Sequence, residues 1–319
     1  MRNAFSKHWF LIALTLALAV GFTFSSLLVP IAEAKWLSKF LLASVLFVMA
    51  FPLQTQVMIG TLARPWAAFL ASAINMALLP VLAWCCMSLL SKDMAVGLVV
   101  AASVPSTLAS GAVWTRRAGG NDAVAMLVTV ITNLFCFAVT PAWLAALLGH
   151  AQTLDYKQMV FKLAVLVVLP MTIAQLLRQQ KALGEWATAH KIQLSTYAQV
   201  GILTMVLIGA INSGNELKAA GISSALPLAE IAKMIAVVVA LHLAVLFLGR
   251  AIANGVGLKR ADQIAVAISG SQKTLMVGLS IAIEYFGGLA ILPMVSYHIA
   301  QLFLDTIVAD RWAKESADS

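Results

Sequence analysis

The chain is dominated by apolar runs that are long enough to cross a membrane as helices. A transmembrane helix needs about 20 consecutive, mostly apolar residues. Ten segments of this kind follow one another with short loops between them, namely residues 9–31, 37–58, 66–90, 94–117, 121–149, 157–179, 192–212, 227–255, 262–286 and 289–309. Only 11% of the residues are charged, whereas a soluble domain carries about 25%. The sequence therefore predicts an all-α polytopic membrane protein with ten transmembrane helices.

The basic residues are spread unevenly over the two sets of loops that ten spans create. One set carries thirteen Lys and Arg residues, the opposite set carries seven, and Lys273 lies inside a span. Because cytoplasmic loops carry an excess of Lys and Arg, we expect both termini in the cytoplasm and the chain in the inner (plasma) membrane. This topology accounts for the net charge of +8, so we predict no nucleic-acid partner.

Ten spans divide into five and five, in residues 1–149 and 150–319. Because five is an odd number, the second half enters the membrane in the opposite orientation to the first. Inverted repeats of this kind are typical of secondary transporters. The two halves show no clear sequence identity, so the expectation depends on a feature that both halves share.

That feature is an interruption near mid-membrane in the fourth span of each half. In the first half, Pro105 removes a backbone donor and disfavours helix at Val104. In the second half, the break is expected around Gly270-Ser271. Non-helical backbone at this depth is tolerated only where it is buried in protein or lines a water-filled cavity. Either break alone is most simply an ordinary kink, but two in matching positions predict a transporter binding site.

A lysine stands in the middle of the ninth span. At 1.5 Å per residue, Lys273 is about 16 Å from either end of the span, which is far for its amine to reach the interface. A charged residue in the centre of a membrane helix costs about 2.5–3.5 kcal/mol on insertion scales. We therefore expect Lys273 to have polar partners in the protein core, with a structural lysine that reaches the interface as the alternative.

Three stretches carry a resemblance to a known family. They are "VPSTLASGAVWTRRAGGNDAVAMLVTVITNLFCFAVTP" (104–141), "AISGSQKTLMVGL" (267–279) and "ILPMVSYHIAQLFLDTIVADRWA" (291–313). The chain resembles the bile acid:sodium symporter family, and within it the bacterial SBF-like branch. The resemblance implies a core domain of spans 3–5 and 8–10 and a panel domain of spans 1, 2, 6 and 7. It also implies that spans 4 and 9 cross at unwound centres, beside a cleft that binds an organic anion, often with sodium.

The family's sodium ligands can be placed on this sequence position by position. Oxygen-bearing residues occupy several of the positions, namely Asn75 ahead of Pro80, Ser110, Thr129 and Thr132 with Asn133 adjacent, and Gln272. Asn75 replaces a glutamine but keeps an amide oxygen, whereas three positions lose the family side chain: Gly111 replaces an asparagine, Ile268 replaces the glutamate and Lys273 replaces another asparagine. The resemblance therefore implies a sodium site that has lost its carboxylate and gained a lysine.

We interpret Lys273 as an ammonium that takes the place of the sodium ion. Its three donors are expected to bridge oxygens of Asn75, Ser110, Thr129, Thr132 and the unwound carbonyls. Either Lys273 stays protonated in a sodium-independent carrier, or it binds and releases a proton during transport. A sodium-coupled symporter that uses the remaining oxygens is the alternative. The expected binding residues are Asn75, Pro105, Ser106, Thr107, Ser110, Thr129, Thr132, Asn133, Ser271, Gln272, Lys273 and Thr274.

The last span carries a polar face. His298, Gln301 and Asp305 are spaced i, i+3 and i+7, which places them on one side of a helix. Proton relays in membrane proteins use His and Asp side chains, which makes His298 and Asp305 candidates for a relay. Interhelical hydrogen bonds are the commoner explanation. His242, in the eighth span, is most simply a core residue.

Other functional classes find less support. The sequence has no HExxH motif, no paired catalytic aspartates and no glycine-flanked nucleophilic serine, so we predict no enzyme, with an intramembrane enzyme or a channel as the alternative class. Cys85, Cys86 and Cys136 lack metal-ligand spacing, and we expect no cofactor beyond a coupling ion, Na⁺ or H⁺. The expected partners are a small anionic substrate and the lipid bilayer, with the chain as a monomer or weak dimer.

Overall fold

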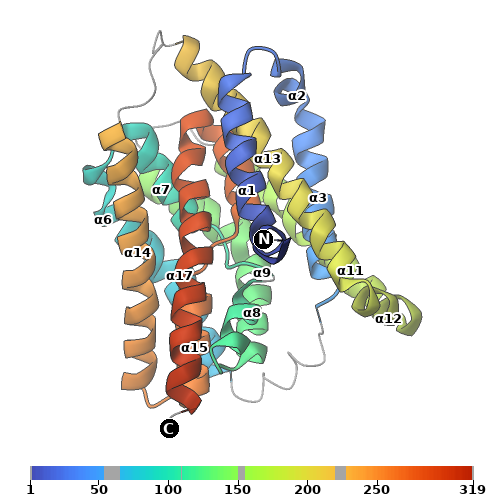
Figure 1. Ribbon diagram of the computed structural model, residues 1–319, viewed down its shortest axis with the longest axis vertical. Coiled ribbons are helices and arrows are strands. Elements are labelled where there is room, and N and C mark those ends of the chain that lie inside the picture. Colours follow the sequence, from blue (N-terminus) through green and yellow to red (C-terminus); the bar gives the residue numbers. More distant parts are fainter. Residues whose placement is uncertain (1, 54–64, 109, 150–154, 220–227, 318–319) are drawn as a thin grey trace.

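The chain forms a bundle of helices that run mostly along its long axis (Figure 1). The computed structural model describes residues 2–53, 65–108, 110–149, 155–219 and 228–317, and no β-strand occurs among them. The first half contains α1 (Arg2–Thr23), α2 (Val29–Glu33), α3 (Lys35–Ala50), α5 (Trp66–Ala73), the π-helical turn η1 (Ile74–Leu78), α6 (Leu79–Cys85), the 3₁₀ turn η2 (Met87–Leu89), α7 (Lys92–Ser103), α8 (Ser110–Arg117) and α9 (Asp122–Leu148).

The second half begins with another helix that contains a π-helical turn. It contains α10 (Tyr156–Leu163), the π-helical turn η3 (Ala164–Val168), α11 (Leu169–Arg178), α12 (Lys181–Ala189), α13 (Lys191–Ala219), α14 (Leu228–Gly255), α15 (Arg260–Ser271), α16 (Leu275–Ile281), the π-helical turn η4 (Ala282–Phe286), the 3₁₀ turn η5 (Gly288–Ala290) and α17 (Ile291–Ala317). Side-chain caps mark two of the helix starts, because the carboxylate of Asp155 and the amide oxygen of Asn121 each accept a first-turn N–H.

Seven helical segments of the described chain are long and apolar enough to cross a membrane. They are Trp66–Cys85, Asp122–Leu148, Tyr156–Arg178, Lys191–Ala219, Leu228–Gly255, Arg260–Phe286 and Ile291–Glu315. The prediction of an all-helical chain with several membrane spans is confirmed, whereas the count of ten stays a prediction.

The other three predicted spans do not form single long helices. The first, 9–31, is divided because α1 ends at Thr23 and α2 starts at Val29. The second, 37–58, corresponds to α3 up to Ala50, and residues 54–58 lie outside the described residues. The fourth, 94–117, consists of α7 and α8, which are separated by the interruption at Pro105.

Both predicted interruptions are present. The first begins where α7 ends, because Val104 is extended (ψ 162°) and Pro105 follows it. The second covers residues 272–274, and Gln272 (ψ 145°) and Thr274 (ψ 126°) are both extended. The second break therefore lies just after Gly270-Ser271, and these two residues form the last turn of α15.

Gly270 serves close packing and is not the point at which the helix breaks. A Cβ atom on Gly270 would lie 3.0 Å from a methyl carbon of Ile74. The absence of a side chain therefore lets α15 approach the helix that carries Asn75. The candidate span Arg260–Phe286, which contains this break, has 94% of its most apolar window buried inside the protein.

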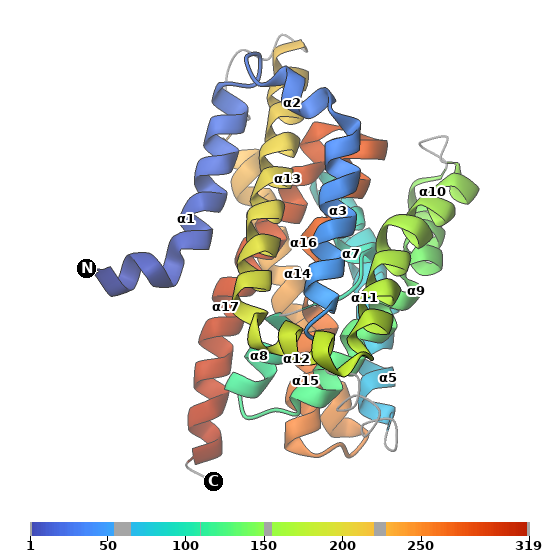
Figure 2. The same cartoon turned by 90° about the vertical axis from the view of Figure 1, so that its right-hand side faces the viewer.

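The helices form two packed groups with the interrupted segments near their junction. In one group α13 packs against α1 and α3, and α3 packs against α11 (Figure 2). In the other group α15 packs against α14, α5 and α9, and α17 packs against α14 and α7. The short helix α16 contacts α3 and α13 from the first group as well as α7 and α17 from the second.

Candidate functional site

The two interruptions cross, and two hydrogen bonds join them. The amide of Thr274 donates to the carbonyl of Pro105 at 2.9 Å. The hydroxyl of Ser106 donates to the carbonyl of Ser269 at 3.0 Å. Residues more than 160 positions apart in the sequence are therefore held together at the centre of the protein.

Three side chains of α9 satisfy the backbone of the first interruption. Thr129 Oγ1 donates to the carbonyl of Thr107 at 2.8 Å, and Asn133 Nδ2 donates to that of Ser106 at 3.0 Å. Thr132 Oγ1 accepts the amide of Ser106 at 3.2 Å. Because buried backbone groups need partners, these residues hold the broken segment in its extended form.

The end of α15 depends on Asn75 in the same way. Its amide nitrogen donates to three carbonyls, those of Ser269 and Gly270 at 3.2 Å and that of Gln272 at 2.8 Å. The carbonyl of Ser271 accepts the Tyr297 hydroxyl at 2.7 Å. The last carbonyls of a helix have no partner within the helix, and here they find donors from other elements, so α15 can end inside the protein.

Lys273 is fully buried, and its amine lies at the crossing. Nζ donates to the backbone carbonyl of Asn75 at 2.6 Å, to Asn75 Oδ1 at 3.0 Å and to the carbonyl of Val104 at 2.7 Å. An ammonium group has three donors and no acceptor, so the three oxygens match it one for one. The interface-seeking alternative is therefore wrong.

The partners of Lys273 differ in part from those expected. Asn75 and an unwound carbonyl contact the amine as anticipated, but Ser110, Thr129 and Thr132 do not. The two threonines are engaged with the first interruption, and Ser110 bonds to Gln272. The physical reason is that broken backbone requires its own hydrogen-bond partners before any side chain is left for the lysine.

Each of the two backbone carbonyls that accept from Lys273 is left without a donor from its own helix by a nearby proline. Asn75 lies in the π-helical turn η1, where the amide of Leu79 bonds to Ile74, and the next residue, Pro80, has no amide hydrogen. The carbonyl of Asn75 therefore lacks a donor from its own helix. Val104 is the residue before Pro105, at which α7 has ended.

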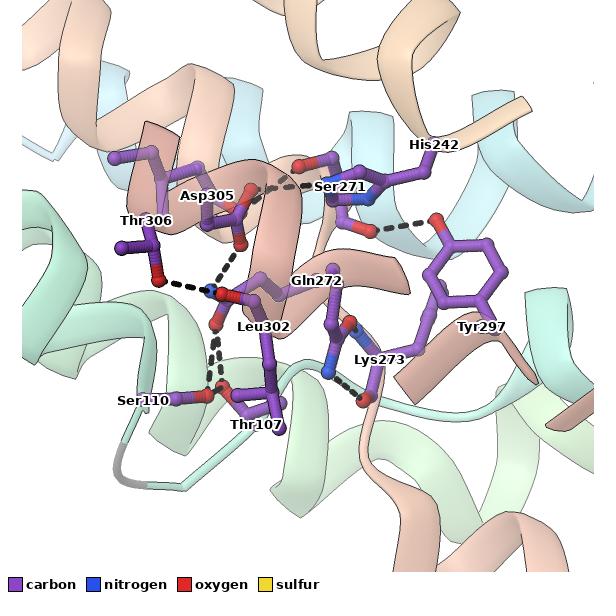
Figure 3. Close-up of polar contacts among 12 residues, drawn as sticks. Thr107, Ser110, His242, Ser271, Gln272, Lys273, Tyr297, Leu302, Asp305 and Thr306 are labelled. Atoms are coloured by element: carbon purple, nitrogen blue, oxygen red, sulfur yellow. Dashed lines mark hydrogen bonds and ion pairs between the residues drawn. The ribbon is translucent and has the colours of Figure 1, made fainter. Parts of the chain in front are cut away.

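The side chain of Gln272 links the crossing to α17 (Figure 3). Its Nε2 donates to Asp305 Oδ2 at 2.5 Å, and its Oε1 accepts the hydroxyls of Thr107 at 2.7 Å and Ser110 at 3.1 Å. A Cβ atom at Gly111 would come within 3.3 Å of this oxygen. The glycine that replaces the family asparagine thus leaves room for the Gln272 amide.

Asp305 has a second donor in His242 of α14. The distance from His242 Nε2 to Asp305 Oδ1 is 2.9 Å, and both side chains are fully buried. His242 Nδ1 is buried and meets no partner among the described residues. A hydrogen on Nδ1 would be unsatisfied, so the tautomer with its hydrogen on Nε2 fits best. Asp305 then accepts from both neighbours, which is the pattern of a carboxylate.

His298 and Asp305 do not meet, so the expected relay between them has no direct contact. Gln301 lies against Lys273 instead: the Lys273 amide donates to Gln301 Oε1 at 2.9 Å, and Gln301 Nε2 donates to the Lys273 carbonyl at 3.0 Å. These bonds fix the orientation of the Gln301 amide, whose Nε2 also faces His298 Nδ1 at 2.9 Å. His298 Nδ1 must accept, so its ring hydrogen is on Nε2.

A small cleft of about 140 Å³ lies beside the crossing. The crossing side includes Thr107, Ser110, Thr274 and His298, and α13 contributes Gln199 and other residues. His298 is 8% exposed and borders the cleft, and its Nδ1 is engaged by Gln301. The ring hydrogen on Nε2 is therefore the donor that this side chain can offer to an acceptor.

A larger cavity of about 720 Å³ lies further along the same junction. Charged residues of both signs line it, namely Glu33, Lys35, Lys39, Lys162, Glu216 and Glu284. Lys162 Nζ and Glu284 Oε1 are 2.6 Å apart, which joins α10 to η4.

Two contributors to the site were not foreseen from the sequence. Tyr297 satisfies Ser271 and packs edge-on against His242, with ring centroids 5.5 Å apart. His242 was interpreted as an ordinary core residue, and its contact with Asp305 was not anticipated. The only signal was that Tyr297 and Gln301 are one helical turn apart and so share a face.

The sequence was compared with known families and proteins. The model of the SBF-like CPA transporter family matches residues 8–314. "Probable sodium/metabolite cotransporter BASS4, chloroplastic" of Arabidopsis thaliana is 24% identical, over 98% of this chain and 74% of that protein. "Sodium/bile acid cotransporter 7" of Rattus norvegicus is 21% identical, over 95% of this chain and 91% of that protein. "Putative symporter YfeH" of Escherichia coli is 23% identical, over 67% and 64%.

Proposed function

Since the chain belongs to the SBF-like CPA transporter family, whose members are transporters and not enzymes, we propose that it moves a small organic anion across the inner membrane by alternating access. In this proposal the ammonium of Lys273 occupies the place of a bound sodium ion. The relatives named as sodium cotransporters support carriage of a small molecule. The lysine distinguishes the proposed mechanism from theirs.

One observation carries the proposal, the set of three oxygens around Lys273 Nζ. Hard cations in proteins are bound by oxygen ligands, including carboxylates. In this proposal the ammonium of Lys273 already occupies such oxygens. The position of the family glutamate is Ile268, which is buried and apolar. A sodium ion close to the ammonium would be repelled strongly in a medium of low dielectric constant, so these residues do not fit a bound sodium.

The same geometry favours one of the two lysine mechanisms. A neutral amine has two hydrogens and a lone pair, so one of the three surrounding oxygens would face that lone pair without a hydrogen bond. A protonated Lys273 leaves no group unsatisfied. We therefore propose a carrier that is independent of sodium and in which Lys273 keeps its proton.

The helix packing supports the core-and-panel architecture. The panel would consist of α1, α3, α10–α11 and α13, and the core of α5–α6, α7–α8, α9, α14, α15–α16 and α17. The broken pairs would each count as one span, which gives ten spans, cytoplasmic termini and inverted repeats in residues 1–149 and 150–319. Rocking of the core against the panel would expose the small cleft to each side in turn.

The donors of the cleft support an anionic substrate. His298 and Thr274 border the space together with Thr107 and Ser110, whose hydroxyls already donate to Gln272. A charge-assisted hydrogen bond from a fixed donor is stronger than a neutral one. We propose a small carboxylate or similar oxyanion as the substrate, bound against His298.

The test has two stages. A thermal-shift screen of the purified protein against small carboxylates, in sodium and in choline buffer, identifies a ligand. Uptake and counterflow of that ligand in proteoliposomes then follow, with sodium replaced by choline. Saturable counterflow of equal rate in both salts is expected. The equal rates would show independence from sodium, and the counterflow itself would distinguish a carrier from a channel, which gives none. Uptake that requires sodium would overturn the proposal in favour of a sodium symporter.

A further inference from the structure

Lys273 and Asp305 are two ionisable side chains buried at the centre of the protein. Among the described Lys, Arg, Asp and Glu residues, they alone are fully buried, each with 0% exposure. They form no direct ion pair, since the oxygens around Lys273 Nζ belong to Asn75 and Val104. A buried charge without compensation is strongly destabilising, so the question is what balances each of them.

Hydrogen bonds of Asn75 and Gln272 connect the surroundings of Lys273 with those of Asp305. Lys273 Nζ donates to Asn75 Oδ1 at 3.0 Å, and Asn75 Nδ2 donates to the carbonyl of Gln272 at 2.8 Å. Gln272 Nε2 then donates to Asp305 Oδ2 at 2.5 Å (Figure 3). Each bond donates in the direction from the ammonium to the carboxylate. The path changes from the backbone carbonyl of Gln272 to its side-chain amide, so Gln272 and Asn75 position the two charges, which act on each other through space.

The neighbours of Asp305 leave Lys273 as its natural counter-charge. His242 faces it from α14 as a neutral donor, and Tyr297 lies against His242. Further along α17, Asp310 is engaged by Arg117 of α8, and Glu315 by two arginines. In a region of low dielectric constant, the attraction between opposite charges extends beyond direct contact. Lys273 can therefore balance the charge of Asp305 although the two side chains do not touch.

We propose that Asp305 is the internal counter-ion of Lys273, so that a carboxylate from α17 serves the purpose that the family glutamate, here Ile268, serves elsewhere. The crossing then contains its own cation and its own anion. Asp305 is a positioning residue, because it acts on the lysine without touching it. This inference rests on the proposed replacement of sodium by Lys273.

A vacated lysine position tests the proposal. Lys273→Ala removes the cation but leaves the oxygens of Asn75 and Val104 and the charge of Asp305. We expect sodium chloride, compared with choline chloride, to raise the melting temperature of purified Lys273→Ala and to leave that of the wild type unchanged. In Lys273→Ala/Asp305→Asn the sodium effect should disappear, and in Lys273→Ala/Asp305→Glu it should return.

The outcomes separate the two ideas. A sodium effect in Lys273→Ala that persists with Asp305→Asn would support the sodium position and overturn the role of Asp305. If sodium affects none of the variants, or already raises the melting temperature of the wild type, the replacement of sodium by Lys273 fails. The role of Asp305 is then decided by a comparison that does not involve sodium.

That comparison is a double-mutant cycle in choline. If the charges compensate each other, Lys273→Ala/Asp305→Asn should melt higher than the sum of the single losses predicts, and should fold even if a single variant does not. Glu315→Gln, which removes an exposed carboxylate from the same helix, is the matched control and should combine additively with Lys273→Ala. Additive losses, or an unfolded double variant beside folded single variants, would overturn the proposal.

Discussion

The amine of Lys273 lies 2.6 Å from the backbone carbonyl of Asn75, which is an oxygen that an ordinary helix would use internally. The contact depends on two local features of the third span, a π-helical turn and the proline that follows it. Binding of the internal cation is thus specified by backbone geometry as well as by side chains.

Pro80→Ala should restore the missing helix donor. The new amide of residue 80 would compete with Lys273 for the Asn75 carbonyl, so one hydrogen bond replaces another and the free energy of unfolding should change by less than about 1.5 kcal/mol. Counterflow should fall, because the lysine loses a partner at the crossing. Pro170→Ala, which lies after the π-helical turn η3, is the control, and equal counterflow in the two variants would contradict the account.

Asn75→Ala should be among the most destabilising single changes. It removes Oδ1 from Lys273 and the donor shared by three carbonyls, and each buried group left unsatisfied costs about 1–3 kcal/mol. Thermal melting measures the loss. Asn215→Ala, in the wall of the larger cavity, should change the unfolding free energy by no more than about 0.5 kcal/mol. Comparable melting of the two variants would be evidence against the role of Asn75.

His298→Phe should weaken ligand binding and also lower the free energy of unfolding by about 1–3 kcal/mol, because the Gln301 amide loses one of its acceptors. The substitution also removes the Nε2–H, and a hydrogen bond to a charged group contributes about 1.5–3 kcal/mol, or about 10- to 100-fold in affinity. Titration of the ligand found by the screen measures the change. His298→Gln should retain part of the affinity, and His190→Phe should retain all of it. Unchanged affinity in His298→Phe would remove His298 from the site.

Lys162→Met and Glu284→Gln should each change stability only slightly. The two groups are 26% and 29% exposed, and a pair of this kind contributes about 0–1 kcal/mol. A double-mutant cycle should give a coupling energy within that range that falls as salt is added. A salt-independent coupling well above it would show that the pair is an essential link between α10 and η4.

The coarse architecture could be predicted because it depends on properties that the sequence displays directly. Apolar length fixes where helices can cross a membrane, and Pro105 fixes the first break through its missing donor. The second break was expected around Gly270-Ser271 and lies just after them, at residues 272–274. The helix continues through Ser271 because Asn75 and Tyr297 supply donors to its last carbonyls, which local propensity cannot reveal.

The contacts within the site were harder to predict. Asn75 was found through the family resemblance, but the hydroxyls of Thr129 and Thr132 were assigned to Lys273 when the nearby backbone uses them. The pairing of His242 with Asp305 joins α14 to α17 across 63 positions of sequence. Nothing in the spacing of either residue indicates it, because it arises only when the helices pack.

The most direct test of the central claim is the binding of radioactive sodium to the purified wild-type protein. If the ammonium of Lys273 holds the place of the ion, the wild type should show no saturable sodium binding, whereas Lys273→Ala should gain it. Saturable binding of sodium to the wild type, at a level of one ion or more per chain, would contradict the account.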